Sequence, residues 1–155
     1  MKNDLLQRLP QLLPLVSQWA EQQESIIIRD GIALPDIALA DAKNIGVEFP
    51  EKIRLLQVDA IPSPEHSDLQ QAAIATQLIT KNTAGLTLRY GIFIRHDCWN
   101  DRRLIAHECA HTAQYEHMGS IETFLQQYLR ECIEIGYPAA PMEQEAIRAE
   151  KLIKG

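Results

Sequence analysis

Apolar residues recur at helical spacing in the first part of the chain. Between residues 5 and 23 the leucines, one valine and one tryptophan fall on one face, which predicts an amphipathic helix. Pro10 and Pro14 lie inside this stretch, so we expect them to kink the helix. Residues 35–46 predict a second, short helix that ends at a glycine.

The C-terminal part shows the same periodicity more clearly. Residues 121–133 place their apolar side chains on one helical face, with Ser120 as a candidate N-cap and Gly136 after the end. The stretch MEQEAIRAEKLI predicts a last helix, with Pro141 near its start. We therefore expect helices at both ends of the chain.

The middle of the chain has the patterns of strands. Residues 52–61 predict one strand, and the alternation in residues 84–95 predicts another directly before the next helical segment. LQQAAIATQLI fits a helix or a strand equally well. The pattern predicts an α+β fold, with a helical part (1–50), a strand-rich part (52–96) and a second helical part (101–155).

Composition narrows the class of protein. The chain has 155 residues, 46% of them hydrophobic, which suits one domain with a single core. Its formal net charge of -6, with no dense run of lysine and arginine, argues against nucleic acid or an anionic membrane as a partner. No apolar run has the length of a membrane span, and the N-terminal stretch lacks the features of a signal peptide.

The cysteines indicate a reducing compartment. Cys98, Cys109 and Cys132 are odd in number and have no C-x-x-C spacing, so neither a disulfide framework nor a thiolate metal site is indicated. Together with the absence of a signal peptide pattern, this predicts a cytoplasmic protein.

The stretch HECAHTAQYEH, residues 107–117, contains the pattern H-E-x-x-H. On a helix, His107 and His111 lie one turn apart on one face and can reach the same metal ion, whereas Glu108 is directed at a water molecule on that ion. Cys109 points to the opposite face and is expected to be a small buried hydrophobe. The pattern predicts a catalytic zinc site.

The pattern leaves several candidates for the third protein ligand. His117 has the spacing of a metzincin ligand, but Gln114 replaces the glycine at which those proteins turn the chain. On an unbroken helix His117 cannot reach the same ion, so we interpret it as a surface or outer-sphere histidine. The last helix offers Glu143, Glu145 and Glu150 instead.

A resemblance favours one of these glutamates. LIAHECAHTAQYE, followed by GSIETFLQQYL and GYPAAPMEQEA, resembles small bacterial gluzincin-like domains over roughly residues 87–150. The resemblance implies a zincin-like fold, in which a small mainly antiparallel or mixed sheet packs on the H-E-x-x-H helix. It also implies Glu143 as third ligand, because Ala146 supplies the small residue three positions later. Ile147 replaces an aspartate of several gluzincins, which leaves the outer hydrogen-bond partners of the histidines unassigned.

The resulting hypothesis is a zinc-dependent hydrolase, most simply a metallopeptidase acting on a peptide or protein. Zn²⁺ would be held by His107, His111 and Glu143, and Glu108 would act as general base. Tyr137 is a candidate oxyanion stabiliser. The strand predicted before the motif could bind an extended peptide at its edge. Two alternatives are a zincin-fold binding or regulatory module without turnover and a metal-free helical domain with an accidental motif.

Overall fold

A small mixed β-sheet lies at the centre of the computed structural model, which describes residues 2–153. Its strand order is β1-β2-β4-β3; β2 and β4 are parallel, and the other two pairs are antiparallel. The strands are β1 (Ile32–Ala33), β2 (Arg54–Val58), β3 (Gly85–Leu88) and β4 (Gly91–Arg95). The predicted α+β class with a small mixed sheet is confirmed.

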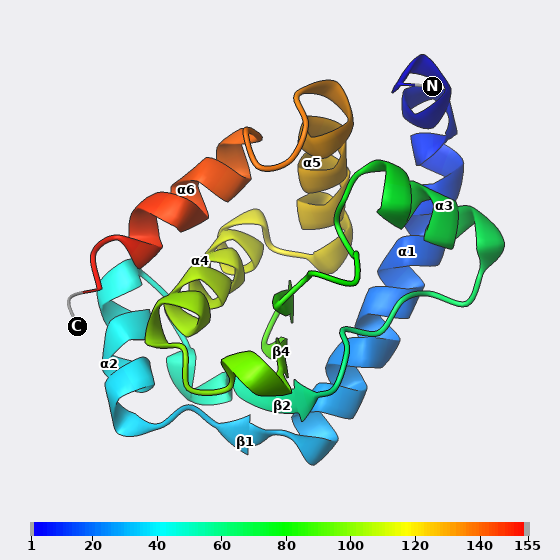
Figure 1. Cartoon of the computed structure of the whole chain (residues 1–155). Coiled ribbons are helices and arrows are strands. Elements are labelled where there is room, and N and C mark those ends of the chain that lie inside the picture. The colour runs from blue at the N-terminus through cyan, green and yellow to red at the C-terminus, as the bar shows by residue number, and fades with distance from the viewer. Residues whose placement is uncertain (1, 154–155) are drawn as a thin grey trace.

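Six α-helices in the described residues surround this sheet. They are α1 (Lys2–Asp30), α2 (Asp36–Ile45), α3 (Ser67–Ala75), α4 (Arg102–Met118), α5 (Ile121–Glu134) and α6 (Pro141–Glu150), with short 3-10 turns at Pro50–Lys52 and His96–Cys98. Helix α1 runs along one side of the molecule, and α2 and α6 lie on the other side of α4 (Figure 1). No helix within residues 2–153 has the length and apolar character needed to cross a membrane.

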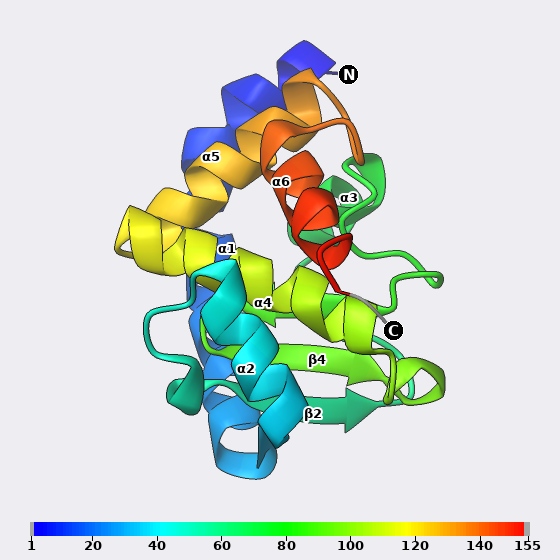
Figure 2. The ribbon, with the colours of Figure 1, turned by 90° about the vertical axis from the view of Figure 1, so that its left-hand side faces the viewer.

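Strand β4 is covered on both faces. Ile92 and Ile94 are fully buried and belong to an apolar cluster that includes Ile105 and Cys109 of α4 and residues of α2. Phe93 faces the opposite way and packs in a second cluster with residues of α1 and α5. Helix α2 therefore lies on one side of β2 and β4, and α1 lies behind them (Figure 2). The sheet positions α4 through this packing.

Helix α1 is longer than the predicted 5–23 segment. It continues through both prolines and on to Asp30, and Ile27 near its end is fully buried against the sheet. The helix ends at Gly31, where a Cβ atom would lie 2.6 Å from the carbonyl oxygen of Ile27 and 2.7 Å from that of Leu55. Contact with the sheet therefore sets the end of the helix, and periodicity in the sequence could not define it.

The single strand predicted for residues 84–95 is wrong, because the chain turns back at Arg89 and Tyr90 to form the antiparallel pair β3 and β4. Arg89 has a left-handed backbone with φ of 61°. The buried Glu24 of α1 holds the turn: its carboxylate accepts from the Arg89 guanidinium at 2.6 and 2.9 Å and from the Tyr90 N–H at 3.0 Å. A carboxylate 65 residues away thus stabilises a turn that has no Asn-Gly signal.

The other elements agree more closely with the sequence. Helix α2 ends at Gly46, whose φ of 115° is the expected left-handed cap, and the Ser120 hydroxyl caps α5 by accepting from the Thr123 N–H at 3.1 Å. The strand predicted at 52–61 is shorter, and the ambiguous LQQAAIATQLI contributes to helix α3. The short β1 lies in the part expected to be helical, where it pairs with β2.

Candidate metal centre

Helices α4 and α6 bring two histidines and a glutamate together. The Glu143 carboxylate bridges the histidines, with Oε1 at 2.6 Å from His107 Nε2 and Oε2 at 3.2 Å from His111 Nε2. One potential ligand atom from each residue lies within 4.8 Å of the others. The Glu143 side chain is 2% exposed and that of His107 is 12% exposed, so the group is shielded from solvent but can be reached from one side.

One small residue and one buried carboxylate position α6 for this contact. Ala146, one turn after Glu143, is fully buried and allows α6 to approach α4 closely. The N–H of Met142 donates to the buried Glu131 of α5 at 2.8 Å, which fixes the first turn of α6. Glu143 lies in that first turn, where the helix dipole favours a carboxylate.

Each histidine is held by a second hydrogen bond on its other ring nitrogen. His111 Nδ1 lies 2.8 Å from Gln114 Oε1, and His107 Nδ1 lies 3.0 Å from Glu150 Oε1. Amide and carboxylate oxygens only accept, so both Nδ1 atoms carry the proton, and both Nε2 atoms face Glu143. Metal-binding histidines are oriented by such outer partners in proteins. Gln114 and Glu150 thus take the role that the sequence left unassigned.

Gln114 also ties the two ligand helices together. Its Nε2 donates to the carbonyl oxygen of Met142 at 2.9 Å and to Glu145 Oε1 at 3.2 Å. One side chain therefore orients His111 and holds the peptide unit next to Glu143. In the sequence Gln114 was notable as the residue that replaces a metzincin glycine and as the glutamine after H-E-x-x-H in the stretch that resembles gluzincin-like domains.

The other candidate third ligands lie elsewhere. Helix α4 is unbroken through Met118, and His117 in its last turn is exposed, as the helical geometry predicted. Glu145 contacts Gln114, and Glu150 contacts the far nitrogen of His107. Of the residues considered, the structure brings only Glu143 to the Nε2 atoms of both histidines.

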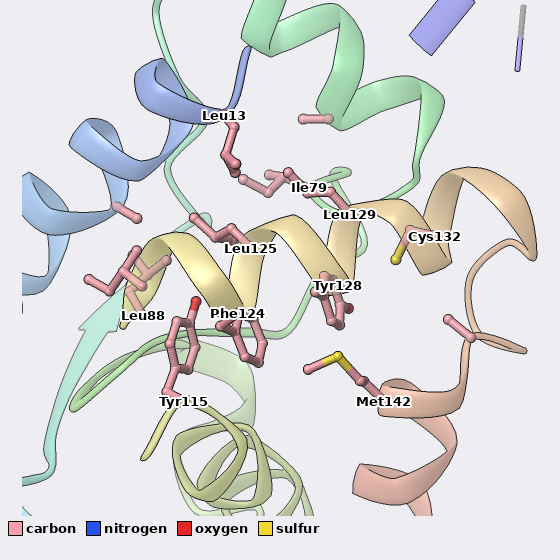
Figure 3. Close-up of a cluster of buried hydrophobic side chains, with 14 of the residues drawn as sticks. Leu13, Ile79, Leu88, Tyr115, Phe124, Leu125, Tyr128, Leu129, Cys132 and Met142 are labelled. Carbon is pink, nitrogen blue, oxygen red and sulfur yellow. The ribbon is translucent and has the colours of Figure 1, made fainter. Parts of the chain in front are cut away.

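An aromatic stack supports the cluster from α5. The rings of Tyr115, Phe124 and Tyr128 are stacked in a row, with centroids 3.6 and 5.4 Å apart (Figure 3). The ring of His111 meets that of Tyr128 edge to face at 5.7 Å, and the Tyr128 hydroxyl donates to Glu143 Oε2 at 2.8 Å. In the sequence Tyr128 falls on the apolar face predicted for residues 121–133. Its hydroxyl could have indicated a contact with the site, because a buried tyrosine requires a polar partner.

Glu108 is held in place from strand β3. Its side chain is buried, and the Thr87 hydroxyl lies 2.7 Å from Glu108 Oε1 and 2.9 Å from the Glu108 carbonyl oxygen. On the same strand, a Cβ atom at Gly85 would lie 3.1 Å from the Glu108 carboxylate. A glycine at this position therefore lets the strand approach the carboxylate, a contact that the sequence did not reveal.

The charges of the cluster are mutually stabilised. Burial lowers the pKa of His107, but the hydrogen bond to Glu143 and the charges of Glu108 and Glu143 outweigh it and raise the pKa to about 9. For His111 burial also opposes the charged form, and the same carboxylates raise its pKa. Burial raises the pKa of Glu143, but hydrogen bonds from both histidines lower it well below its usual range. Glu143 is thus an anion directed at two imidazoles.

Cys109 has no part in the cluster. It is fully buried in the apolar cluster beneath the sheet, and burial raises the pKa of its thiol. The prediction that it is a small buried hydrophobe is confirmed.

A cleft of about 880 Å³ opens onto the cluster. His107, Glu108, His111 and Glu143 line it, together with Tyr137, whose side chain is 40% exposed. Burial, together with the negative charges of Glu143 and Glu108, raises the pKa of Tyr137, so its hydroxyl keeps its proton. The cleft has the volume of a ligand-binding site, and its polar groups converge at the two histidines.

The donor set matches a metal ion. Two imidazole nitrogens and one carboxylate oxygen form a known three-ligand set for a catalytic zinc, which leaves a fourth position for water or substrate. The hydrogen bonds at Nδ1 keep the proton on that nitrogen, so when a metal ion displaces the proton shared with Glu143 each Nε2 would present its lone pair to the ion. The residues therefore fit a divalent metal.

No family model matches this chain, and neither a curated protein nor a solved structure matches it.

Proposed function

We propose that the protein is a zinc-dependent hydrolase of gluzincin type with a zincin-like fold, and that it cleaves peptide bonds. The observation that carries this proposal is the arrangement around one cleft: His107, His111 and Glu143 converge, and Glu108 lies beside them in the same lining. The resemblance of residues 87–150 to gluzincin-like domains supports the same assignment.

Each residue then has a defined task. His107, His111 and Glu143 would hold the ion, and Gln114, Glu150 and Tyr128 would orient these ligands through the hydrogen bonds described above. When bound there, zinc would lower the pKa of a coordinated water molecule and polarise the scissile carbonyl.

The proton transfers fall to Glu108. Its carboxylate would accept a proton from the attacking water and pass it to the leaving amine, which balances the hydrolysis. Thr87 keeps one oxygen of the carboxylate in position. Because the Tyr128 hydroxyl is bonded to Glu143, the half-exposed Tyr137 is our candidate for stabilising the oxyanion.

The outer edge of β3 is our candidate site for the peptide backbone. Strand β3 is at the end of the sheet, and Ala84 accepts a hydrogen bond from Arg95 of β4 at 2.8 Å. Backbone groups alternate along a strand, so Gly85 and Thr87 direct theirs away from β4. The Thr87 carbonyl oxygen already accepts from the Tyr115 hydroxyl at 3.2 Å, so the carbonyl oxygen that would pair with a peptide is that of Gly85. Both residues line the cleft beside Glu108. An extended peptide could add here as a further strand.

Metal analysis and three variants test the proposal. Protein purified without chelator should carry one zinc per chain, and His107→Ala should remove it whereas His117→Ala should not. Glu108→Gln should retain zinc but lose hydrolysis of a quenched fluorescent peptide library, because only the base is changed. Absence of stoichiometric zinc would refute the metal site. Zinc binding without any hydrolysis that depends on Glu108 would instead favour a binding module.

A further inference from the structure

The cleft has an apolar region formed by segments outside the H-E-x-x-H helix. Val16 and Trp19 of α1, Leu78 of the loop after α3, and Leu86 of β3 line it. All four are half-buried and pack on the main apolar cluster, so part of each side chain faces the cleft. None of this region belongs to the metal cluster, yet it is continuous with it through Phe124 and Tyr128.

The polarity of the residues that line the cleft changes along α4. Arg103, His107 and His111 follow one another at intervals of four residues and so lie along one face. Near Arg103 the lining includes the charged Asp101 and Glu150 as well as Leu104 and Ile147. Past His111 the lining is the aromatic stack and the α1 side chains. The metal cluster therefore separates a charged region from an apolar one.

The loop between α3 and β3 closes the apolar region. Thr80 and Thr83 form a tight turn, in which the N–H of Thr80 donates to the Thr83 hydroxyl at 2.8 Å. Leu78 and Ile79 before the turn point into the apolar cluster or its edge, while Lys81 within it is exposed. The loop thus contributes an apolar wall below a polar rim.

Resting on the proposed function, we propose that this apolar region is the specificity pocket of the enzyme and accepts a large apolar side chain of the peptide near the scissile bond. A peptide held at β3 with its carbonyl at the metal cluster has the neighbouring side chains on either side of it along the cleft. Only the side chain past His111 meets Trp19, Val16 and Leu78. A phenylalanine or leucine buries apolar surface there, whereas serine or aspartate loses hydration without a polar partner.

Competition between two matched peptide substrates measures this preference as the ratio of their kcat/KM values. In matched peptides, replacing a single phenylalanine by serine should lower kcat/KM roughly ten- to hundred-fold at one position next to the scissile bond, the effect of burying one such side chain. Trp19→Ala should reduce that ratio, and Val16→Phe, which narrows the pocket, should shift the preference to smaller apolar residues. Leu15→Ala, on the same helix but outside the cleft, should leave the ratio unchanged. Thermal melts verify that each variant is folded.

Binding without turnover separates the pocket from the proposed activity. The chain has two tryptophans, so Trp99→Phe in the Glu108→Gln background leaves Trp19 as the only reporter. We expect the phenylalanine peptide to change Trp19 fluorescence and to bind with at least ten-fold lower Kd than the serine peptide. If this holds but no peptide is cleaved by the parent protein, the pocket stands and the hydrolase assignment fails. Equal affinity for both peptides, or cleavage without any preference for apolar residues, overturns the pocket.

Discussion

Substitution of Gln114 tests whether its hydrogen bonds orient His111 for metal binding. Gln114→Leu keeps the size of a buried side chain but removes the acceptor for His111 Nδ1 and the donor to the Met142 carbonyl oxygen. Without a fixed partner the His111 ring loses its orientation, and loss of such partners weakens metal binding roughly 10- to 100-fold. This corresponds to about 1.4–2.7 kcal/mol of binding free energy.

The same change affects the fold, so the two effects must be measured separately. Two buried polar groups lose their partners, which costs about 3 kcal/mol in the free energy of unfolding. For a chain of this size that lowers Tm by roughly 6–12 °C. We would measure the Kd for zinc by competition with a chromophoric chelator well below Tm, and stability of the metal-free protein by circular dichroism.

Gln144→Leu is the matched control. Gln144 is adjacent to Glu143, but its amide donates only to the exposed Pro138 carbonyl oxygen at 2.7 Å. This variant should leave zinc affinity unchanged. If Gln114→Leu lowered Tm while its Kd for zinc equalled that of the parent, Gln114 would be a packing residue and the reasoning on His111 orientation would be refuted.

Three further predictions concern residues that the sequence alone did not single out. Gly85→Ala places a methyl group 3.1 Å from the Glu108 carboxylate and should lower kcat without loss of zinc, measured by peptide hydrolysis and metal analysis; unchanged kcat would contradict this. Thr87→Val removes the hydroxyl that positions the Glu108 carboxylate and should lower kcat for peptide hydrolysis about ten-fold. Thr87→Ser keeps a hydroxyl and should retain activity. Glu24→Ala removes three hydrogen bonds at the β3–β4 turn and should cost about 2 kcal/mol or more of unfolding free energy in urea titration; a smaller change would mean that the turn does not depend on Arg89.

Local signals in the sequence predicted the part of the site that lies on one helix. H-E-x-x-H spacing on an uninterrupted helix is enough to place His107 and His111 on one face, and the exposure of His117 follows from the same geometry. Helix ends at Ser120 and Gly46 were predictable because caps are local chemistry. Glu143 required more than geometry, and only the resemblance favoured it over two neighbouring glutamates.

The rest depends on contacts between distant segments. Glu150 contacts His107 only because α6 crosses α4, a relation that periodicity cannot supply, whereas Gln114 contacts His111 within one turn of α4. The turn at Arg89 is held by the distant Glu24, so the pattern of residues 84–95 by itself predicts one strand instead of two. Such partners become visible only when two elements are packed, because their spacing in sequence carries no local signal.

The residues of the candidate metal site and the residues of the apolar wall come from different segments of the protein. The proposed ligands and the proposed base come from α4 and α6, where a change in spacing would destroy convergence on one ion. The apolar wall of the cleft comes from α1 and the loop before β3, whose side chains pack on the apolar cluster that contains the aromatic stack. Substitutions at Trp19 or Leu78 can therefore alter which side chain fits without moving a ligand. In the proposed hydrolase, such substitutions would change the preferred substrate and preserve the hydrolytic chemistry.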